Sequence, residues 1–441
     1  MFNRTTLQTL LIISATALSS CITIPNKFTA VAPGYWRAVL KLENKDQPLK
    51  TNSARLDADP EARFEEVSGG ELPFVFEVIY DTPEKFHLEI INGNERMRID
   101  DIQIGRDRKT ARDTIRINFT EYETWISAAY EGNVMEGFWN KAGKKIPFVA
   151  KQGQNFRFST LRKKPDADLT GKWETTFGIE KENVAEQEKA IGEFEQKDNH
   201  IIGTFRTETG DYRFLEGEVQ ANKLYLSAFD GSHAFLFEGK ILAGNKLIGA
   251  FRSGLTTYTQ WEARKNDSFK LRDEYSITTV KSGQETLNFN FTNPEGKTIS
   301  LENPEYNGKV KVLQVSGTWC PNCRDESVFL TEYQKNNPDL AIIGLFFEKH
   351  REKEVANAQL SRYKAKMKIP YETMVVGLAG KNEAAAALPM LENFSAFPTT
   401  IFVDKKNKIR RVHTGFNGPA TSQYKAFTEE FDQFIKKLQA E

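Results

Sequence analysis

The chain has only three cysteines among its 441 residues, namely Cys21, Cys320 and Cys323. It has only five histidines, and no two of them form a His-x-x-x-His pair. The only other cysteine is Cys21, so the sequence does not supply the two further ligands that a zinc site at Cys320 and Cys323 would need. A framework of several disulfides is excluded, so this close pair is better suited to chemistry than to bracing the fold. We expect no metal and no other cofactor.

Neither sign of charge is in excess, since 60 Lys and Arg residues balance 60 Asp and Glu residues. The chain therefore gives no electrostatic reason to expect a nucleic-acid partner. No internal apolar stretch is long enough to form a transmembrane helix. The apolar content of 39%, with 32 phenylalanines, suffices for several cores, and the length suggests two to four domains.

Residues 1–20 have the features of an export signal. One cation, Arg4, precedes the apolar run Leu7 to Leu18, which is too short to span a bilayer comfortably. The sequence Leu18-Ser19-Ser20-Cys21 resembles a bacterial lipoprotein cleavage site, which implies that Cys21 is lipidated and anchors the mature protein. An ordinary secretory signal with an incidental cysteine is the alternative. Ile22, by analogy with lipoprotein sorting, favours a periplasm-facing position on the outer membrane.

Two stretches of the chain have a β pattern. In residues 33–160 and again in residues 168–265, short runs of branched and aromatic residues are separated by Gly, Asn and Asp. Gly171-Lys172-Trp173 in the second stretch repeats Gly34-Tyr35-Trp36 in the first, and a charged joint at 162–166 separates them. We predict two related antiparallel units, each a barrel or a sandwich, with one long barrel as the alternative.

Four tryptophans in these units allow two interpretations. They could line a small lipocalin-like cavity for a ligand or a client protein, or they could fill the cores, and buried aromatics carry most of the packing area in such folds. We favour the core interpretation. The residues are Trp36, Trp139, Trp173 and Trp261.

A strand, a turn and a helix start are predicted around the cysteine pair. The apolar run Val310 to Val315 leads through small residues into Cys320 and Cys323, and an amphipathic segment follows. Unpaired backbone N–H groups and the helix dipole at a helix N-terminus stabilise a thiolate and lower its pKa. Cys320 is therefore the candidate nucleophile, and Cys323, one turn further on, can resolve the mixed disulfide that Cys320 forms.

The context of the pair resembles a known family. Trp319-Cys320-Pro321-Asn322-Cys323 and the segment Ala396 to Asp404 are similar to the thioredoxin superfamily, and within it to the TlpA-like disulfide reductases of the bacterial envelope. The resemblance covers roughly Phe289 to Leu438. It implies an α/β thioredoxin-like fold over residues 285–441, with a central insertion at 369–394, after a polar linker at 266–284. The chain departs from the family at Pro321-Asn322 and at Gln314, where cytosolic thioredoxins have a buried aspartate.

The resemblance also implies roles for four further residues. Pro398 matches the cis-proline whose loop lies against the cysteine pair and offers backbone groups to a substrate strand. Trp319 and Phe397 then flank the substrate, with Trp319 shielding Cys320. Glu326 matches the buried glutamate that accepts a proton from the second thiol. Asp325 is expected to face solvent. An ordinary trans proline, and two exposed helix-capping acids, are the alternatives.

These features predict a lipid-anchored thiol–disulfide oxidoreductase of the cell envelope. It would reduce protein or small-molecule disulfides through a Cys320–Cys323 disulfide and would need a membrane electron donor to be reset. The alternative function is a ligand- or protein-binding lipoprotein in which the β-units act and the thioredoxin fold is a scaffold.

Three other interpretations of the cysteine pair are weaker. A structural disulfide closing so short a loop would stabilise the fold little, and an unreactive pair would explain none of the surrounding motif. Peroxiredoxins require Pro-x-x-x-Thr-x-x-Cys, but Thr318 lies only two positions before Cys320.

Overall fold

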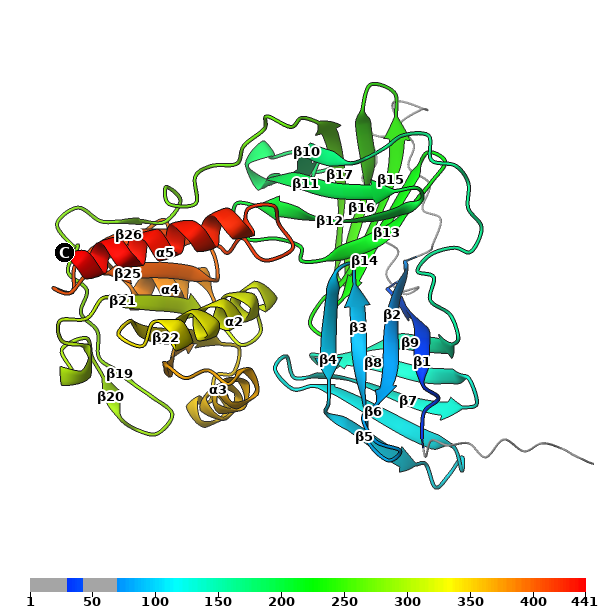
Figure 1. Cartoon of the computed structure of the whole chain (residues 1–441), viewed down its shortest axis with the longest axis horizontal. Helices are drawn as coiled ribbons and strands as arrows, with labels where there is room; N and C mark the ends of the chain where they lie inside the picture. Colours follow the sequence, from blue (N-terminus) through cyan, green and yellow to red (C-terminus); the bar gives the residue numbers. More distant parts are fainter. Residues whose placement is uncertain (1–29, 43–69) are drawn as a thin grey trace, which may run out of the picture.

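The computed structural model describes residues 30–42 and 70–441. The predicted signal peptide and the predicted lipidation site Cys21 lie outside these residues. Figure 1 shows an open sheet (blue to cyan), a barrel (green) and an α/β region (yellow to red). The predicted fold class, two antiparallel β-units followed by a thioredoxin-like α/β fold, is confirmed. In the described part of the chain, no helix combines the length and apolar character needed to cross a membrane.

The first β-unit is an antiparallel sheet of nine strands in the order β4-β3-β2-β1-β9-β8-β7-β6-β5. Buried and partly exposed positions alternate along strands such as β7, as expected for a sheet with one face on a core. β4 and β5 are the two edges, so this unit is a half-barrel. Its strands are β1 (Gly34–Lys41), β2 (Glu71–Tyr80), β3 (Phe86–Asn92), β4 (Glu95–Ile99), β5 (Ile102–Arg106), β6 (Asp113–Phe119), β7 (Thr124–Glu131), β8 (Val134–Lys141) and β9 (Lys144–Gln152).

The second β-unit is a closed barrel of eight strands, in which the last strand pairs with the first. The strands are β10 (Gly171–Phe177), β11 (Glu188–Lys197), β12 (His200–Thr207), β13 (Leu215–Gln220), β14 (Lys223–Phe229), β15 (Ala234–Leu242), β16 (Lys246–Ser253) and β17 (Thr257–Lys265), with a 3₁₀ turn η2 (Val184–Glu186) before β11. Two separate sheets exclude the single long barrel.

The two units share a local detail at their first strands. The indole N–H of Trp36 donates to the carbonyl of Ala32 at 2.9 Å, and that of Trp173 donates to Leu169 at 2.8 Å. In both units the first strand also lies between the second strand and the last. The Gly-x-Trp motif that occurs in both stretches of the sequence therefore occupies the same position in both units.

All four tryptophans are buried, with at most 2% of their surface exposed. In the barrel, Trp261 packs edge-on against Phe205 with 5.6 Å between ring centroids, and Phe205 stacks on Phe237 at 4.8 Å. Aromatic side chains thus fill the barrel interior, which agrees with the core interpretation of the tryptophans.

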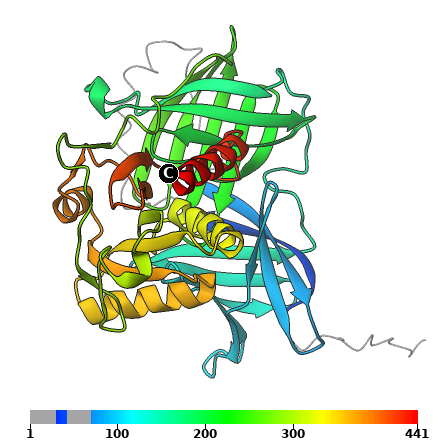
Figure 2. The ribbon, with the colours of Figure 1, turned by 60° about the vertical axis from the view of Figure 1, so that its left-hand side comes forward.

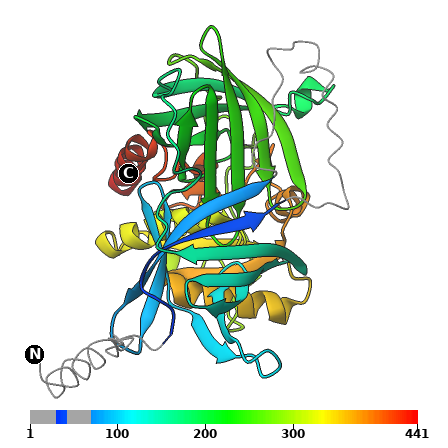
Figure 3. The same cartoon turned by 90° about the vertical axis from the view of Figure 1, so that its right-hand side faces the viewer.

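The barrel sits on the open sheet, as Figure 3 shows from the side of the β-units. The residues around the turn between β14 and β15 make this contact. Phe229 enters the core of the first unit, where its ring centroid lies 4.5 Å from that of Phe74 and 5.0 Å from that of Trp139. Gly231 (φ +83°) passes so close to Phe119 that an added Cβ would lie 2.2 Å from the ring. The core of the half-barrel is therefore completed by residues of the barrel.

The α/β region has a five-stranded sheet in the order β23-β22-β21-β25-β26. β23, β22 and β21 are parallel to one another, whereas β25 is antiparallel to both of its neighbours, β21 and β26. The long elements are β21 (Lys311–Ser316), α2 (Pro321–Asn336), β22 (Ala341–Glu348), α3 (Lys353–Met367), β23 (Glu372–Leu378), α4 (Lys381–Ala387), β25 (Thr399–Val403), β26 (Ile409–Thr414) and α5 (Tyr424–Ala440). The short elements are β18 (Thr279–Val280), β19 (Phe291–Thr292), β20 (Thr298–Ile299), η3 (Pro304–Tyr306) and β24 (Leu391–Glu392).

Helices cover both faces of this sheet (Figure 2). α2, α3 and α5 pack on the face that includes Val312, Ile342 and Phe402, and α4 packs on the other face. β21 and β22 are buried along their whole length, as is typical of central strands in a sheet covered on both faces. The segment 266–284 packs on this region, because β18 pairs with β24 and Thr278 is buried.

Candidate redox site

The two cysteines lie at the start of α2, directly after the turn that follows β21. Cys320 is the N-cap residue of the helix, and the backbone N–H of Cys323 donates to the Cys320 sulfur at 3.2 Å. Pro321 is the first helical residue, where the missing N–H removes no helical hydrogen bond. The two sulfurs form a disulfide, and the Cα atoms are 5.2 Å apart. A reduced Cys320 would face the positive end of the helix dipole.

The Phe397–Pro398 peptide bond is cis, and it lies against the cysteines. The carbonyl oxygen of Phe397 is 3.6 Å from the Cys320 sulfur. Pro398 immediately precedes β25, which pairs with β21, and this pairing carries the proline loop to the end of the cysteine strand. The structure thus brings together residues that are 77 positions apart in the sequence.

Trp319 is fixed beside the same loop. Its indole N–H donates to the carbonyl of Phe347 at 2.8 Å, and its ring packs edge-on against Phe397 with 5.6 Å between centroids. The ammonium of Lys349 lies 5.1 Å from the indole. Trp319 and Phe397 are both half-buried, so part of each remains available to a substrate.

Glu326 is buried, with 1% of its surface exposed, one helical turn after Cys323. Burial raises the pKa of Glu326 to about 7, although the Thr400 hydroxyl donates a hydrogen bond to Oε1 that favours the carboxylate. The second oxygen, Oε2, is buried and accepts no hydrogen bond from any residue in the described part of the chain. Glu326 can therefore hold or release a proton near neutral pH, as a proton acceptor for Cys323 requires.

Glu348 is a second buried acid near the pair, and the sequence reasoning missed it. It ends β22 and accepts the N–H of Thr318 at 2.9 Å and the Thr318 hydroxyl at 2.7 Å. Burial raises the pKa of Glu348 to about 7 despite these two bonds. Because adjacent parallel strands end at the same edge of a sheet, an acid closing the apolar run 340–347 could have been recognised as a neighbour of the cysteine turn.

Gln314, at the position where cytosolic thioredoxins have a buried aspartate, makes neutral hydrogen bonds. Its amide donates to the Ser327 hydroxyl at 3.0 Å and to the Cys323 carbonyl at 3.3 Å. Its oxygen accepts the Tyr371 hydroxyl at 3.0 Å. Position 314 therefore places no second carboxylate beside Glu326 in this chain.

The expectation that Asp325 faces solvent is wrong. Its side chain is 9% exposed and pairs with the guanidinium of Arg213, a residue of the barrel that is 4% exposed. Arg213 also binds Glu95 at 2.6 Å and lies 3.6 Å from Asp230. Helix α2 faces the β-units, and no local pattern in the sequence indicates a partner 112 residues away.

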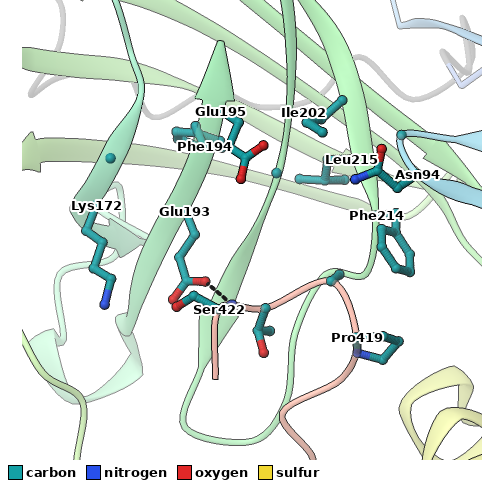
Figure 4. Close-up of a pocket in the computed structure, with 15 residues that line it drawn as sticks. Asn94, Lys172, Glu193, Phe194, Glu195, Ile202, Phe214, Leu215, Pro419 and Ser422 are labelled. Atoms are coloured by element: carbon teal, nitrogen blue, oxygen red, sulfur yellow. Dashed lines mark hydrogen bonds between the residues drawn. The ribbon is translucent and has the colours of Figure 1, made fainter. Parts of the chain in front are cut away.

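A cavity of about 340 Å³ lies where the two β-units meet the loop before α5 (Figure 4). Glu193 projects into this region and accepts the backbone N–H of Ser422 at 2.7 Å. Neither the cysteines nor Pro398 line the cavity, so it is separate from the redox site. Within residues 30–42 and 70–441, no group of three His, Cys, Asp or Glu side chains is arranged to hold a metal ion.

Comparisons with known proteins match the same part of the chain. Residues 281–427 match the family model described as Redoxin. The thioredoxin-like protein YneN of Bacillus subtilis (strain 168) is 25% identical over 170 residues, which cover 38% of this chain and 89% of that protein.

Two solved structures match a similar share of this chain. A thiol:disulfide interchange protein of the thioredoxin family from Chlorobium tepidum TLS is 19% identical and covers 35% of this chain and 95% of its own, with a TM-score of 0.27. A thiol-disulfide oxidoreductase from Bacteroides fragilis NCTC 9343 is 17% identical and covers 34% and 98%, with a TM-score of 0.26. All these matches span about a third of the chain.

Proposed function

We propose, from the redoxin domain that residues 281–427 form, that this thiol–disulfide oxidoreductase acts as a reductant in the bacterial cell envelope. One observation carries the proposal. The Cys320 sulfur caps helix α2, accepts the Cys323 N–H at 3.2 Å, and lies 3.6 Å from the Phe397 carbonyl at the proline loop. This arrangement provides a stabilised thiolate, a resolving thiol and a docking loop within one site.

The reaction transfers two electrons and two protons to the substrate. The Cys320 thiolate attacks one sulfur of a substrate disulfide, forms a mixed disulfide and releases the other substrate sulfur, which takes up a proton. Cys323 then loses its proton and attacks the Cys320 sulfur. The Cys320–Cys323 disulfide forms, and the second substrate thiolate leaves and is protonated. Each turnover leaves the chain oxidised, so a membrane electron donor is needed to reset it.

Glu326 supports both the proton transfer and the reducing direction. Its raised pKa of about 7 lets the carboxylate accept the Cys323 proton near neutral pH. A buried negative charge beside the pair also makes a thiolate less favourable. Because that charge destabilises the reduced form of the pair, it favours electron donation by this domain.

The first test measures direction and chemistry on the full chain. A reductase should have a reduction potential nearer the thioredoxin value of about −270 mV than the value of about −120 mV found for a strong oxidant of this fold. Reduction of hydroxyethyl disulfide should disappear in Cys320→Ser, and Cys323→Ser should accumulate mixed disulfides. Equal reduction of hydroxyethyl disulfide by wild type and Cys320→Ser would contradict the proposal. No reduction by either chain would favour the ligand-binding alternative.

The envelope location rests on the sequence of residues 1–21. We propose that Cys21 carries the acyl anchor and that the domain faces the periplasm from the outer membrane. Labelling growing cells with a radioactive fatty acid should mark the wild type and leave Cys21→Ser unlabelled. Membrane fractionation then distinguishes the outer from the inner membrane, and label on the Cys21→Ser chain would overturn the anchor.

A further inference from the structure

We propose that residues 208–214, the wall loop between β12 and β13 of the barrel, form one side of the redox site and determine its substrate class. The site would accept disulfides in small molecules and in extended, unfolded segments, and would exclude disulfides held in a folded domain. This inference rests on the reductase function proposed above.

The wall loop lies directly on the two residues between the cysteines. The side-chain amide of Asn322 donates to the carbonyl of Asp211 at 3.2 Å, and the Arg213 guanidinium lies 3.4 Å from the Pro321 carbonyl. A Cβ added at Gly210 (φ +148°) would lie 2.1 Å from the Asn322 side chain. Glycine is favoured here, because other residues rarely adopt this φ and a Cβ would have to displace the Asn322 side chain. The backbone of the barrel therefore lies against Pro321 and Asn322, the two residues between the cysteines.

The same loop covers the chain that follows β26. The backbone N–H of Gly418 donates to the Asp211 carboxylate at 2.9 Å. A Cβ added at Gly415 would lie 2.8 Å from the backbone of Thr209, and the Gly415 N–H donates to the Pro398 carbonyl at 2.9 Å. The wall loop therefore reaches the residues that hold the proline loop in place.

The wall loop is held firmly in this position. The Thr207 N–H donates to the Gly210 carbonyl at 2.7 Å, and the Arg213 N–H donates to the Asp211 carboxylate at 2.6 Å. At the end of the loop, the buried Arg213 guanidinium pairs with Asp325 of α2. These bonds make the loop a fixed boundary of the site.

The accessible part of the site lies on the side of Trp319 and Phe397, which are half-buried, while Cys320 is only 7% exposed. A folded partner would need a broad contact, about 800 Å² on each side in a standard interface, but the wall loop already covers Pro321 and Asn322 beside the cysteines. An extended segment needs only a narrow path along the proline loop, where main-chain hydrogen bonds supply affinity. The cover that the wall loop provides on one side of the site therefore selects flexible or small disulfides.

The test compares three substrates with the full chain: hydroxyethyl disulfide, an unstructured peptide containing one disulfide, and the same disulfide loop grafted into a folded carrier domain. We expect kcat/KM for the free peptide to exceed that for the carrier at least tenfold. Replacing Glu208-Thr209-Gly210 with a single glycine should raise the carrier rate at least fivefold and leave hydroxyethyl disulfide within twofold.

A second variant adds bulk and leaves the loop length unchanged. Thr209→Trp should lower the carrier rate further, whereas Thr256→Trp, at an exposed position in the turn between β16 and β17, should change no rate. Equal kcat/KM values for the peptide and the carrier in the wild type would overturn the inference. So would a peptide-to-carrier ratio of kcat/KM that is the same in both loop variants as in the wild type. If hydroxyethyl disulfide is also not reduced, the proposed reductase function fails as well.

Discussion

The guanidinium of Arg213 in the barrel pairs with the carboxylate of Asp325, two residues after Cys323 in helix α2. Glu95 of the half-barrel and Asp230 of the barrel face the same guanidinium. One buried cation therefore links the half-barrel, the barrel and the α/β region. Although burial opposes it, the charges of Asp325, Glu95 and Asp230 keep the pKa of Arg213 well above its ordinary value. The redox helix is thus oriented by a residue outside the redoxin domain.

Removing this cation should destabilise the chain strongly. Arg213→Met leaves three buried carboxylates with less compensation, and we expect the free energy of unfolding to fall by about 3–5 kcal/mol. Asp325→Asn should cost less, because Arg213 keeps Glu95 and Asp230. Urea denaturation followed by fluorescence measures both. Arg106→Met is the matched control, since the ion pair of Arg106 with Asp113 joins two exposed side chains, and such pairs contribute about 0–1 kcal/mol. Equal costs for Arg213→Met and Arg106→Met would contradict the role of Arg213.

The pH dependence of disulfide reduction should depend on Glu326. The wild-type rate should change between pH 6 and 8 with a midpoint near the Glu326 pKa of about 7. Glu326→Gln cannot take up the Cys323 proton, so we expect a rate at least about tenfold lower at pH 7 and no such midpoint. Glu332→Gln, on the exposed side of the same helix, serves as control and should keep the wild-type profile. A midpoint near pH 7 that persists in Glu326→Gln would rule out this role.

Stability should fall with rising pH because of the two buried acids. Burial raises the pKa values of Glu326 and Glu348 to about 7, so between pH 5 and 8 the folded state binds more protons than the unfolded state. The stabilisation from each protonated acid is present below its unfolded-state pKa and is lost as pH rises to 8, at most about 3 kcal/mol per acid.

Glu348→Gln should therefore halve the loss of stability contributed by the two acids between pH 5 and 8, and the double variant with Glu326→Gln should abolish it. Thermal melts at half-unit pH steps give the slopes. The same slope in wild type and Glu348→Gln would show that Glu348 remains charged in the folded chain throughout this range.

Phe229 should carry much of the contact between the barrel and the half-barrel. It is fully buried between Phe74, Phe119 and Trp139. Phe229→Ala should reduce stability by about 3–5 kcal/mol, since it leaves a cavity where the two units meet. Phe138→Ala, at a position that is 43% exposed, provides the control and should cost far less. Limited proteolysis should cut between the two β-units faster in Phe229→Ala, and unchanged proteolysis would argue against this contact.

Local patterns predicted the elements that carry the redox chemistry. The apolar run ending at Val315, the proline after Cys320 and the amphipathic segment beyond it placed a strand, a turn and a helix where β21 and α2 are found. The β pattern of residues 33–160 and 168–265 predicted two antiparallel units. Such features follow from short-range backbone geometry and from the period of the apolar residues, so a sequence alone contains them.

Other features depend on contacts between residues far apart in the chain. β10 and β17 close the barrel, whereas β4 and β5 remain edges of an open sheet whose core takes up Phe229. Asp325 is buried by Arg213, and the wall loop reaches Asn322, only because the three bodies pack together. The residue types and local periods of the sequence determined the secondary structure and the reactive pair. The packing of the barrel against α2 decided which side of that pair is covered, because side chains more than 100 residues apart meet only in the folded chain.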